Sequence, residues 1–230
     1  MYPDECIQSL NEYPWWEEDQ GKDYCRGRLC YAHVPHVVQT PLTLHPEARS
    51  EDTNHREVDA SIEQMRISQK KRIKALPLAG LPLHHNELYT VYKAKVRPCL
   101  IIGDGWDNLP EQFTKNRPGW QRTPIITVIP YYGIEKDGSR AAFPPAFIER
   151  VRHCEYPQFF WDILPTNKKE SLLILSHLQP VGRHHDSIEL TPHRLHESAL
   201  VVMDEYLRWS LGHKRQEDDF ISLFKGILTA

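Results

Sequence analysis

Arg97 carries the strongest chemical signal in this sequence. It ends a basic, β-rich approach that begins at Tyr89, and Pro98 leads from it directly into the apolar strand 99–102. A guanidinium keeps its proton at any ordinary pH, and a proline biases the residue before it toward extended backbone. The sequence therefore predicts a permanent cation at the mouth of a buried strand, where an anionic group could meet it. The alternative is an arginine paired with a structural carboxylate.

Two phenols and several imidazoles could supply the rest of a site. Tyr131 and Tyr132 could stack on a nucleobase or donate a hydroxyl to a phosphate, or they could be ordinary barrel aromatics. His177 stands in an apolar stretch, which favours a satisfied core histidine over a general base. His184 follows in a loop, where a titrating imidazole would be accessible, so it is a candidate for acid–base work.

Further cations and aromatic rings could contact a nucleic-acid strand. Lys70 and Lys71 belong to a basic stretch that is either a solvated helix face or a phosphate contact. Trp106 and Trp120 lie in a long polar loop, where they could stack on unpaired bases or pin the loop to the protein.

The cysteines and histidines give little support to a metal site. Cys25, Cys30, His33 and His36 come close together, but their spacing is not one that zinc sites use. On a strand, His33 would also point away from Cys30 and His36. We expect no metal and no cofactor.

Composition and charge narrow the class of protein. The 230 residues include 28 basic and 31 acidic side chains, and a net charge of -3 argues against a general binder of polyanions. No apolar run is long enough to cross a membrane, and the N-terminus lacks the apolar core of a secretory signal. Five cysteines at irregular spacing are typical of reduced thiols. We expect a cytoplasmic protein with no membrane partner.

The elements that must position Arg97 begin with a strand. Residues 28–38 alternate in hydrophobicity and are rich in β-formers, which predicts a first strand. Residues 39–54 contain two prolines and a polar cluster, which predicts a loop. Ahead of the strand, Trp15 and Trp16 are either tucked onto the protein body by an N-terminal arm or exposed to a partner.

A helix is expected after the loop. Asn54 and Glu57 have the spacing of a capping box, and apolar residues then recur at helical spacing up to about Lys74. Further on, the sequence predicts strands at 88–94, 98–102, 124–132, 158–164 and 171–178, and a short helix at 145–152.

Helices are expected at the C-terminal end of the chain. Thr191 and Pro192 have the types that begin a helix, Gly212 has the type that ends one, and a final amphipathic helix follows within 213–230. This order of elements predicts a mainly β protein with helices, an α+β class, built on a small and strongly curved β-barrel.

Several segments occur in a single recognisable order. They are 26–31 (RGRLCY), 95–102 (KVRPCLII), 123–130 (TPIITVIP) and 171–181 (SLLILSHLQPV), ahead of a capped C-terminal helix. In this order, and above all in its Arg-Pro strand, the chain resembles the MazF/PemK (Kid) toxins of bacterial toxin–antitoxin systems. The resemblance covers residues 26–38 and 88–212.

The resemblance implies an SH3-like barrel with a C-terminal helix, usually homodimeric, that cleaves single-stranded RNA without metal through attack of the ribose 2′-hydroxyl. The family's arginine falls on Arg97, and its catalytic threonine falls at about Tyr132, with Thr127 earlier on that strand. An arginine of the later strand pair falls on Gln179, with Arg183 close by.

The expected catalytic residues are Arg97, Tyr132, Thr127 and His184. The expected RNA contacts are Lys95, Tyr131, Trp106, Trp120, Arg183, Lys70 and Lys71.

The same resemblance suggests a division of the chain. Residues 1–22 would be an N-terminal arm, 23–212 a MazF/PemK-like barrel domain with a helical insertion at 39–87, and 213–230 a C-terminal helix. The insertion could cap the RNA groove, offer its basic face to RNA, or stand in for an antitoxin helix. Two functions remain open: an endoribonuclease toxin controlled by an antitoxin protein, or a catalytically silent module of the same fold that binds protein or RNA.

Overall fold

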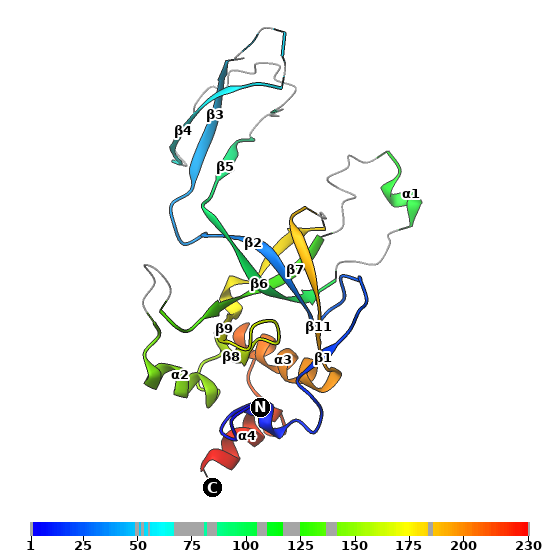
Figure 1. Ribbon diagram of the computed structural model, residues 1–230, viewed down its shortest axis with the longest axis vertical. Coiled ribbons are helices and arrows are strands. Elements are labelled where there is room, and N and C mark those ends of the chain that lie inside the picture. The colour runs from blue at the N-terminus through cyan, green and yellow to red at the C-terminus, as the bar shows by residue number, and fades with distance from the viewer. Residues whose placement is uncertain are drawn as a thin grey trace. The chain divides into compact units, whose positions relative to one another are not determined.

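The computed structural model describes residues 2–48, 51, 53–54, 56–66, 81, 87–104, 110–116, 125–136, 142–183 and 186–229 (Figure 1). The chain divides into two compact units. Unit 1 comprises Met1–His33 and Val96–Ala230, and unit 2 comprises Val34–Lys95. The segment predicted to be an insertion, 39–87, falls inside unit 2, while the division into arm, barrel and final helix stays a prediction.

Unit 1 is built on a sheet of short antiparallel strands. Among the described residues the sheet has eight strands in the order β1-β11-β2-β6-β7-β9-β8, and β10 pairs with β7 beside this path. The strands are β1 (Trp16–Glu18), β2 (Arg28–Pro35), β6 (Ala94–Gly103), β7 (Ile125–Gly133), β8 (Phe159–Ile163), β9 (Glu170–Ile174), β10 (Gln179–Gly182) and β11 (Ile188–Leu195).

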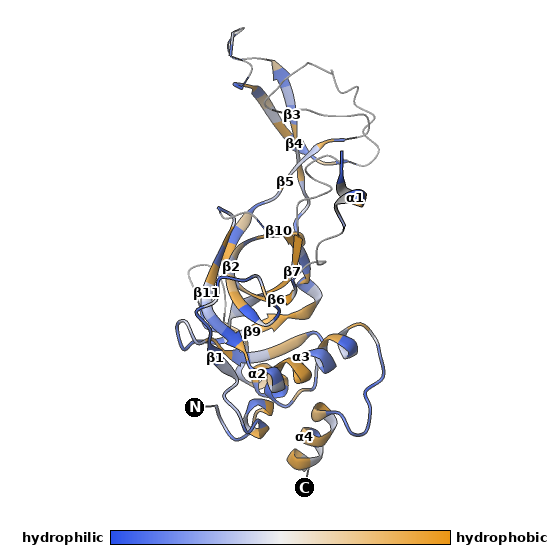
Figure 2. Ribbon diagram, turned by 90° about the vertical axis from the view of Figure 1, so that its right-hand side faces the viewer, coloured by the Kyte–Doolittle hydropathy of each residue, from blue (hydrophilic) through white to orange (hydrophobic). Residues whose placement is uncertain are grey.

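Helices accompany this sheet. In the part that the structure describes, the 3-10 helices are η1 (Ile7–Leu10) and η3 (Leu175–His177), and the α-helices are α1 (Glu111–Thr114), α2 (Pro145–Arg152), α3 (Glu197–Ser210) and α4 (Phe220–Thr229). Figure 2 shows hydrophobic residues over most of α4. Ile221 and Phe224 of α4 are buried, whereas Phe220, Leu223 and Ile227 are exposed. One apolar face of α4 is therefore buried, and further apolar side chains of the helix are exposed.

One core joins the sheet to α3, α4 and the N-terminal arm. Leu100 and Ile129 from the middle strands pack in the same cluster as Tyr206 of α3 and Phe224 of α4. Trp15 belongs to this cluster and stacks on the ring of Phe160, with the ring centroids 5.6 Å apart. Trp15 is therefore tucked onto the body, and Trp16 is partly buried against the same cluster. Complete burial of a large apolar side chain contributes about 1.5–3 kcal/mol.

Unit 2 contains a sheet of β4 (Asp59–Gln64), β3 (Leu42–Ala48) and β5 (Tyr89–Val91), in that order. The expected loop at 39–54 and helix at 54–74 are therefore wrong where they overlap β3 and β4, and residues 67–80 lie outside the described part. Ile62 has helical spacing to its apolar neighbours, but it pairs with Leu44 as part of an antiparallel ladder. Cross-strand pairing has overridden the local periodicity.

Pro46 explains why β3 resembled a loop. Proline cannot donate to a ladder and is tolerated in strands at edges or bulges. The register of β3 against β4 shifts between Pro46 and Ala48, which places the proline at such an irregularity.

Pro192 likewise explains why part of β11, in unit 1, resembled the start of a helix. Thr191 and Pro192 lie inside β11 and do not begin a helix, and the register of β11 against β2 shifts between Leu190 and Arg194. The Thr191 hydroxyl donates to the carbonyl oxygen of Leu29 at 2.8 Å. Helix α3 begins after His196 instead, whose side chain accepts from the backbone N–H of Ser198.

The remaining predicted elements are largely confirmed. Strands occur at 28–35, 125–133 and 159–163, α2 lies at the expected place, and α4 is the final helix. The strand expected at 171–178 stops at Ile174, where η3 takes over. The chain is mainly β with helices, although its strands do not form a closed barrel in the part that the structure describes.

Candidate functional site

The sheet register sets Arg97 opposite Tyr132. Cys99 on β6 pairs with Pro130 on β7, and two further residues along that antiparallel register bring Arg97 level with Tyr132. Cys99 is buried and Arg97 is half-buried, so β6 leaves the core between them. The sequence had placed the guanidinium at the mouth of this strand, and the structure places it there.

The guanidinium lies on the face of the Tyr132 ring. The Cζ atom of Arg97 is 4.1 Å from the ring centroid, well inside the range of a cation–π contact. Successive side chains of a strand point to opposite faces of the sheet. Tyr132 therefore faces Arg97, and Tyr131 points the other way. Tyr131 is buried and donates its hydroxyl to Asp162 at 3.0 Å.

His177 completes this cluster of three side chains. It ends η3, between β9 and β10, and its Nδ1 lies 2.7 Å from the Tyr132 hydroxyl oxygen. The two rings meet edge to face, with centroids 5.3 Å apart. Arg97, Tyr132 and His177 are therefore in consecutive contact, and we call them the Arg97 cluster.

The charge state of the Arg97 cluster follows from burial and from the guanidinium. Burial, and to a lesser degree the charge of Arg97, lowers the pKa of His177 below its ordinary value of 6.5. Burial raises the pKa of Tyr132 above 10.0, and Arg97 partly opposes that shift. At neutral pH the imidazole is therefore uncharged and can accept the proton of the Tyr132 hydroxyl.

The Arg97 guanidinium can still donate hydrogen bonds to an anionic ligand. Within the described ranges it forms no ion pair with a carboxylate, and its Nε is buried with no hydrogen-bond partner. An arginine can bind two oxygens of a phosphate with its parallel N–H groups. The arrangement thus brings together a hydroxyl, a neutral imidazole and a cation that has no carboxylate partner among the described residues.

Other expected site residues do not join this cluster. Thr127 lies five residues before Tyr132 on β7 and so on the opposite face, beside Gly103. Tyr131 was an expected RNA contact, but the structure assigns it to the core. Lys95 is exposed and belongs to unit 2.

Arg183 lies at the far end of β7 from Tyr132. Gly182 pairs with Ile125, seven residues from Tyr132, which is roughly 23 Å along a strand. The Arg183 guanidinium sits 5.1 Å from the centroid of the Tyr24 ring. Five further expected site residues lie outside the described residues: His184, Trp106, Trp120, Lys70 and Lys71.

The sequence favoured a core role for His177, so this residue was not among the expected catalytic residues. Its apolar neighbours suggested a core strand, but the strand ends at Ile174 and the imidazole is only partly buried. The signal that could have found it is Pro180, because a proline three residues on argues against a continuous central strand through His177.

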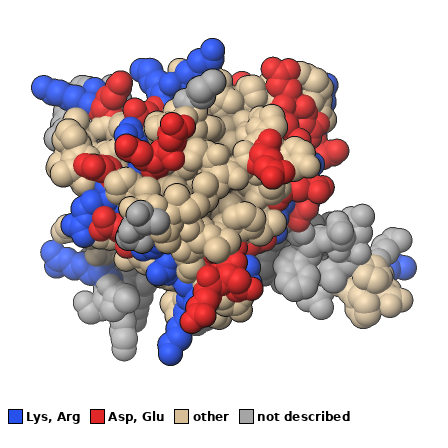
Figure 3. Space-filling view, turned by 90° about the horizontal axis from the view of Figure 1, so that it is seen from below, with Lys and Arg blue, Asp and Glu red and all other residues tan. Residues whose placement is uncertain are grey.

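The described part of the chain contains no group of three or more histidine, cysteine, aspartate or glutamate side chains placed to hold a metal ion. None of the helices in that part has both the length and the apolarity needed to span a membrane. Acidic and basic side chains are interspersed on the face shown in Figure 3. That face is therefore not a one-sided cationic surface for nucleic acid.

Comparison with known proteins gives no relative. No family model matches the chain, and neither the curated proteins nor the solved structures contain a significant match.

Proposed function

We propose that the chain is a MazF-like, metal-independent endoribonuclease that cleaves single-stranded RNA at the Arg97 cluster. The observation that carries this proposal is the hydrogen bond of 2.7 Å between the Tyr132 hydroxyl and His177, beneath a guanidinium with no carboxylate partner among the described residues. Metal-free cleavage of RNA needs a proton acceptor, a proton donor and positive charge beside the phosphate. The three side chains are of types that can meet these three needs.

The cleavage step can be written with these side chains alone. The Tyr132 oxygen takes the proton of the ribose 2′-hydroxyl as its own proton passes to Nδ1 of His177. The 2′-oxygen attacks the adjacent phosphorus, and Arg97 holds the phosphate oxygens as negative charge develops on them. The 5′-oxygen leaves and takes the proton back from the imidazolium through Tyr132. The products are a 2′,3′-cyclic phosphate and a 5′-hydroxyl.

The strand arrangement supports an SH3-like barrel as the framework of this site. Strands β11, β2, β6 and β7 are successive neighbours, and β10 pairs with the free edge of β7 at Ile125–Val128. The last strand of this run, β10, continues along the chain into its first strand, β11. A run of five short strands whose first and last members follow one another in the chain is compatible with such a barrel, although the described strands do not close it.

Tyr132 stands where the resemblance expects a threonine, and we propose that it replaces that hydroxyl. A phenol bonded to an imidazole can relay a proton, which an isolated threonine does less readily. We extend the proposal to a toxin that acts in the cytoplasm as a homodimer and is held in check by an antitoxin protein.

A cleavage assay on mixed single-stranded RNA in the presence of a chelator tests the proposal. We expect wild-type protein to cut the RNA and Arg97→Ala to cut it about 10²–10³ times more slowly, the usual effect of removing one donor to a developing oxyanion. Arg150→Ala is a matched control, because Arg150 also lies over a tyrosine ring, 5.0 Å from the Tyr156 centroid, but is paired with Glu155. Equal loss in both variants would contradict the assignment.

A second candidate function is an RNA-binding module without catalysis. The observation that favours it is the position of Thr127, which lies on the opposite face of β7 from the Arg97 cluster. In that case the guanidinium would still bind a phosphate. RNA would then bind in a salt-dependent way that Arg97→Ala weakens, and no cleavage would occur.

A further inference from the structure

Asp162 is a buried carboxyl surrounded by hydrogen-bond donors. It lies in β8 with none of its surface exposed. Its Oδ1 accepts from the Tyr2 hydroxyl at 2.7 Å and from Trp16 Nε1 at 3.4 Å, and its Oδ2 accepts from the Tyr131 hydroxyl at 3.0 Å. The backbone N–H of Ile163 donates as well, at 2.7 Å. The proposed cleavage step does not use this group.

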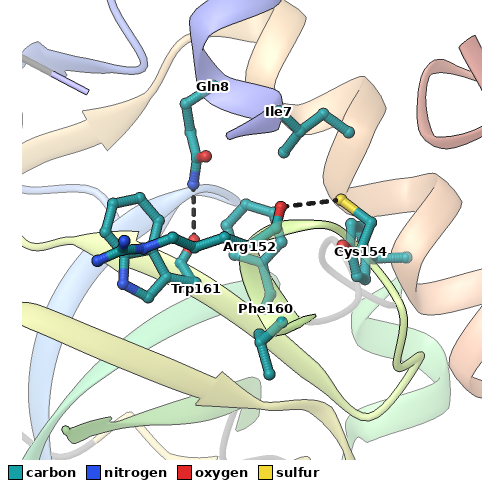
Figure 4. A pocket seen from close by; sticks show the side chains of 8 residues that line it. Ile7, Gln8, Arg152, Cys154, Phe160 and Trp161 are labelled. Atoms are coloured by element: carbon teal, nitrogen blue, oxygen red, sulfur yellow. Dashed lines mark hydrogen bonds between the residues drawn. The ribbon is translucent and has the colours of Figure 1, made fainter. Parts of the chain in front are cut away.

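The N-terminal segment, residues 2–10, covers this carboxyl. It supplies Tyr2, and its only regular element in the structure is η1, which pairs with no strand. Gln8 donates to the carbonyl oxygen of Trp161 at 2.6 Å, and Ile7 lies beside it (Figure 4). Cys6, Ile7 and Gln8 are all buried. Ile7 also packs in the main core, with Tyr2 and Leu10 against it. Because no strand ladder holds residues 2–10, their opening need not unfold the sheet.

Burial favours the neutral form of Asp162, whereas its hydrogen-bond donors favour the ionised form. The ionisable groups that face it are Tyr2 and Cys6 from the N-terminal segment and Tyr131 from β7, and none of these is a cation. No ion pair to Asp162 occurs among the residues that the structure describes. Burial raises the pKa of Asp162 from 3.8 to about 6, although the hydrogen bonds from Tyr2 and Tyr131 act in the opposite direction.

The site can also satisfy the protonated carboxyl. The Tyr2 hydroxyl lies 3.3 Å from the carbonyl oxygen of Ile163 as well as 2.7 Å from Asp162. When the carboxyl is neutral, it can donate its proton to the Tyr2 oxygen while Tyr2 donates to Ile163. Both protonation states therefore keep Tyr2 hydrogen-bonded, but only the ionised state places a buried negative charge where the described residues supply no counter-ion.

We propose that Asp162 is a proton-operated latch for the N-terminal segment. Protonation holds residues 2–10 closed over β8, and ionisation favours their opening, because opening lets water reach the carboxylate. The closed state binds the proton more tightly than the open state, so closure weakens as the pH rises. This inference stands apart from the RNA-cleaving role, and its test does not involve RNA.

Cys6 reports on the latch, because it is buried in the closed segment. Short pulses of N-ethylmaleimide on the full chain, followed by peptide mass spectrometry, give the labelling rate of Cys6 at each pH. Dividing by the rate in the denatured chain at the same pH removes the titration of the thiol. We expect this normalised rate to rise by roughly 25-fold between pH 4.5 and pH 7.5, the size that follows from a carboxyl pKa near 6 in the closed state and 3.8 in the open state.

Three comparisons make the assay specific. Asp162→Asn should flatten the pH dependence, whereas Asp204→Asn, the same change at a half-exposed carboxyl, should keep it. Cys30 and Cys99 are buried in β2 and β6 and should stay unlabelled, which separates local opening from global unfolding.

If Asp162→Asn fails to fold, Tyr2→Phe tests the same claim. Loss of this donor removes a bond that favours the ionised carboxyl, so the pH midpoint of Cys6 labelling should move upward. A normalised Cys6 rate that does not change with pH in wild type, or an unchanged midpoint in Tyr2→Phe, would overturn the latch.

Discussion

At the scale of single residues, the site depends on how burial sets the protonation of His177. The lowered pKa leaves the imidazole neutral at pH 7, so the proposed proton acceptor is ready near neutrality. Cleavage should therefore increase as the pH rises through this pKa, which lies below 6.5, and level off before pH 7.

This pH profile shows whether His177 acts as a general base or has no role in the proton transfer. We expect His177→Ala to lower the rate of cleavage by about 10²–10⁴ and to abolish the acidic limb of the profile, measured under single-turnover conditions. His213→Ala, a change at an exposed histidine, is the control. A mutant that retains the acidic limb would show that another group titrates.

Asp162 makes a separate prediction on stability. Its pKa in the folded protein, about 6, lies above the ordinary 3.8, so its favourable contribution is complete below about pH 4 and is lost as the pH rises through 6. Since each pKa unit is worth 1.36 kcal/mol, the whole shift corresponds to about 3 kcal/mol, of which about 2 kcal/mol of unfolding free energy should be lost between pH 4 and pH 7.

Urea titrations of wild type and Asp162→Asn at both pH values measure this difference. The asparagine variant should lose less stability than wild type on going from pH 4 to pH 7, and the exposed Asp218→Asn should behave like wild type. A difference between wild type and Asp162→Asn that is the same at both pH values would refute the buried-charge explanation.

At the scale of elements, two glycines should respond in opposite directions to alanine. Gly27 has φ +85°, and a Cβ there would lie 3.0 Å from a methyl carbon of Leu200. We expect Gly27→Ala to lower the free energy of unfolding by about 1–2 kcal/mol, because the left-handed backbone conformation is unfavourable for a residue with a Cβ. Gly226 lies inside α4 with open space around it, so Gly226→Ala should raise the stability by about 0.5–1 kcal/mol. Chemical denaturation of both variants measures the pair, and equal signs would contradict it.

The sequence predicted elements well where local pattern and tertiary pairing agree. The alternation of β2, the apolar run of β7 and the spacing in α2 and α4 all led to the right element. Two wrong predictions, a loop in place of β3 and a helix start in place of β11, arose from prolines. Pro46 and Pro192 both lie at irregularities of a strand ladder, and the local sequence does not predict such irregularities. The third error, at Ile62, arose because helical spacing and strand pairing compete and the pairing is remote in sequence.

The candidate site was predictable in part. Arg97 and Tyr132 were expected from their sequence, and the register of β6 against β7 is what brings them into contact. The place of His177 depends on where β9 ends, which the apolar run 171–175 conceals. Its partnership with Tyr132 spans 45 residues, a separation at which local patterns carry no information.

At the scale of the whole molecule, unit 2 is inserted between two strands that are neighbours in the sheet of unit 1. Chain segments enter and leave unit 2 close together, since the backbone N–H of His36 donates to the carbonyl oxygen of Lys93 at 2.8 Å. This bond fits the base of a two-residue hairpin. We expect replacement of residues 37–92 by Asn-Gly to leave a protein that unfolds cooperatively, as followed by circular dichroism. Loss of cooperative unfolding would show that unit 1 needs unit 2.

The central claim is that the Arg97 cluster cleaves RNA through the ribose 2′-hydroxyl. The most direct measurement compares one single-stranded RNA with its fully 2′-O-methylated copy, in chelator, with analysis of the product ends. Wild-type protein should cut only the unmethylated strand and leave 2′,3′-cyclic phosphate and 5′-hydroxyl ends, while Arg97→Ala leaves both strands nearly intact. Cleavage of the methylated copy, or equal cleavage by wild type and Arg97→Ala, would contradict the claim.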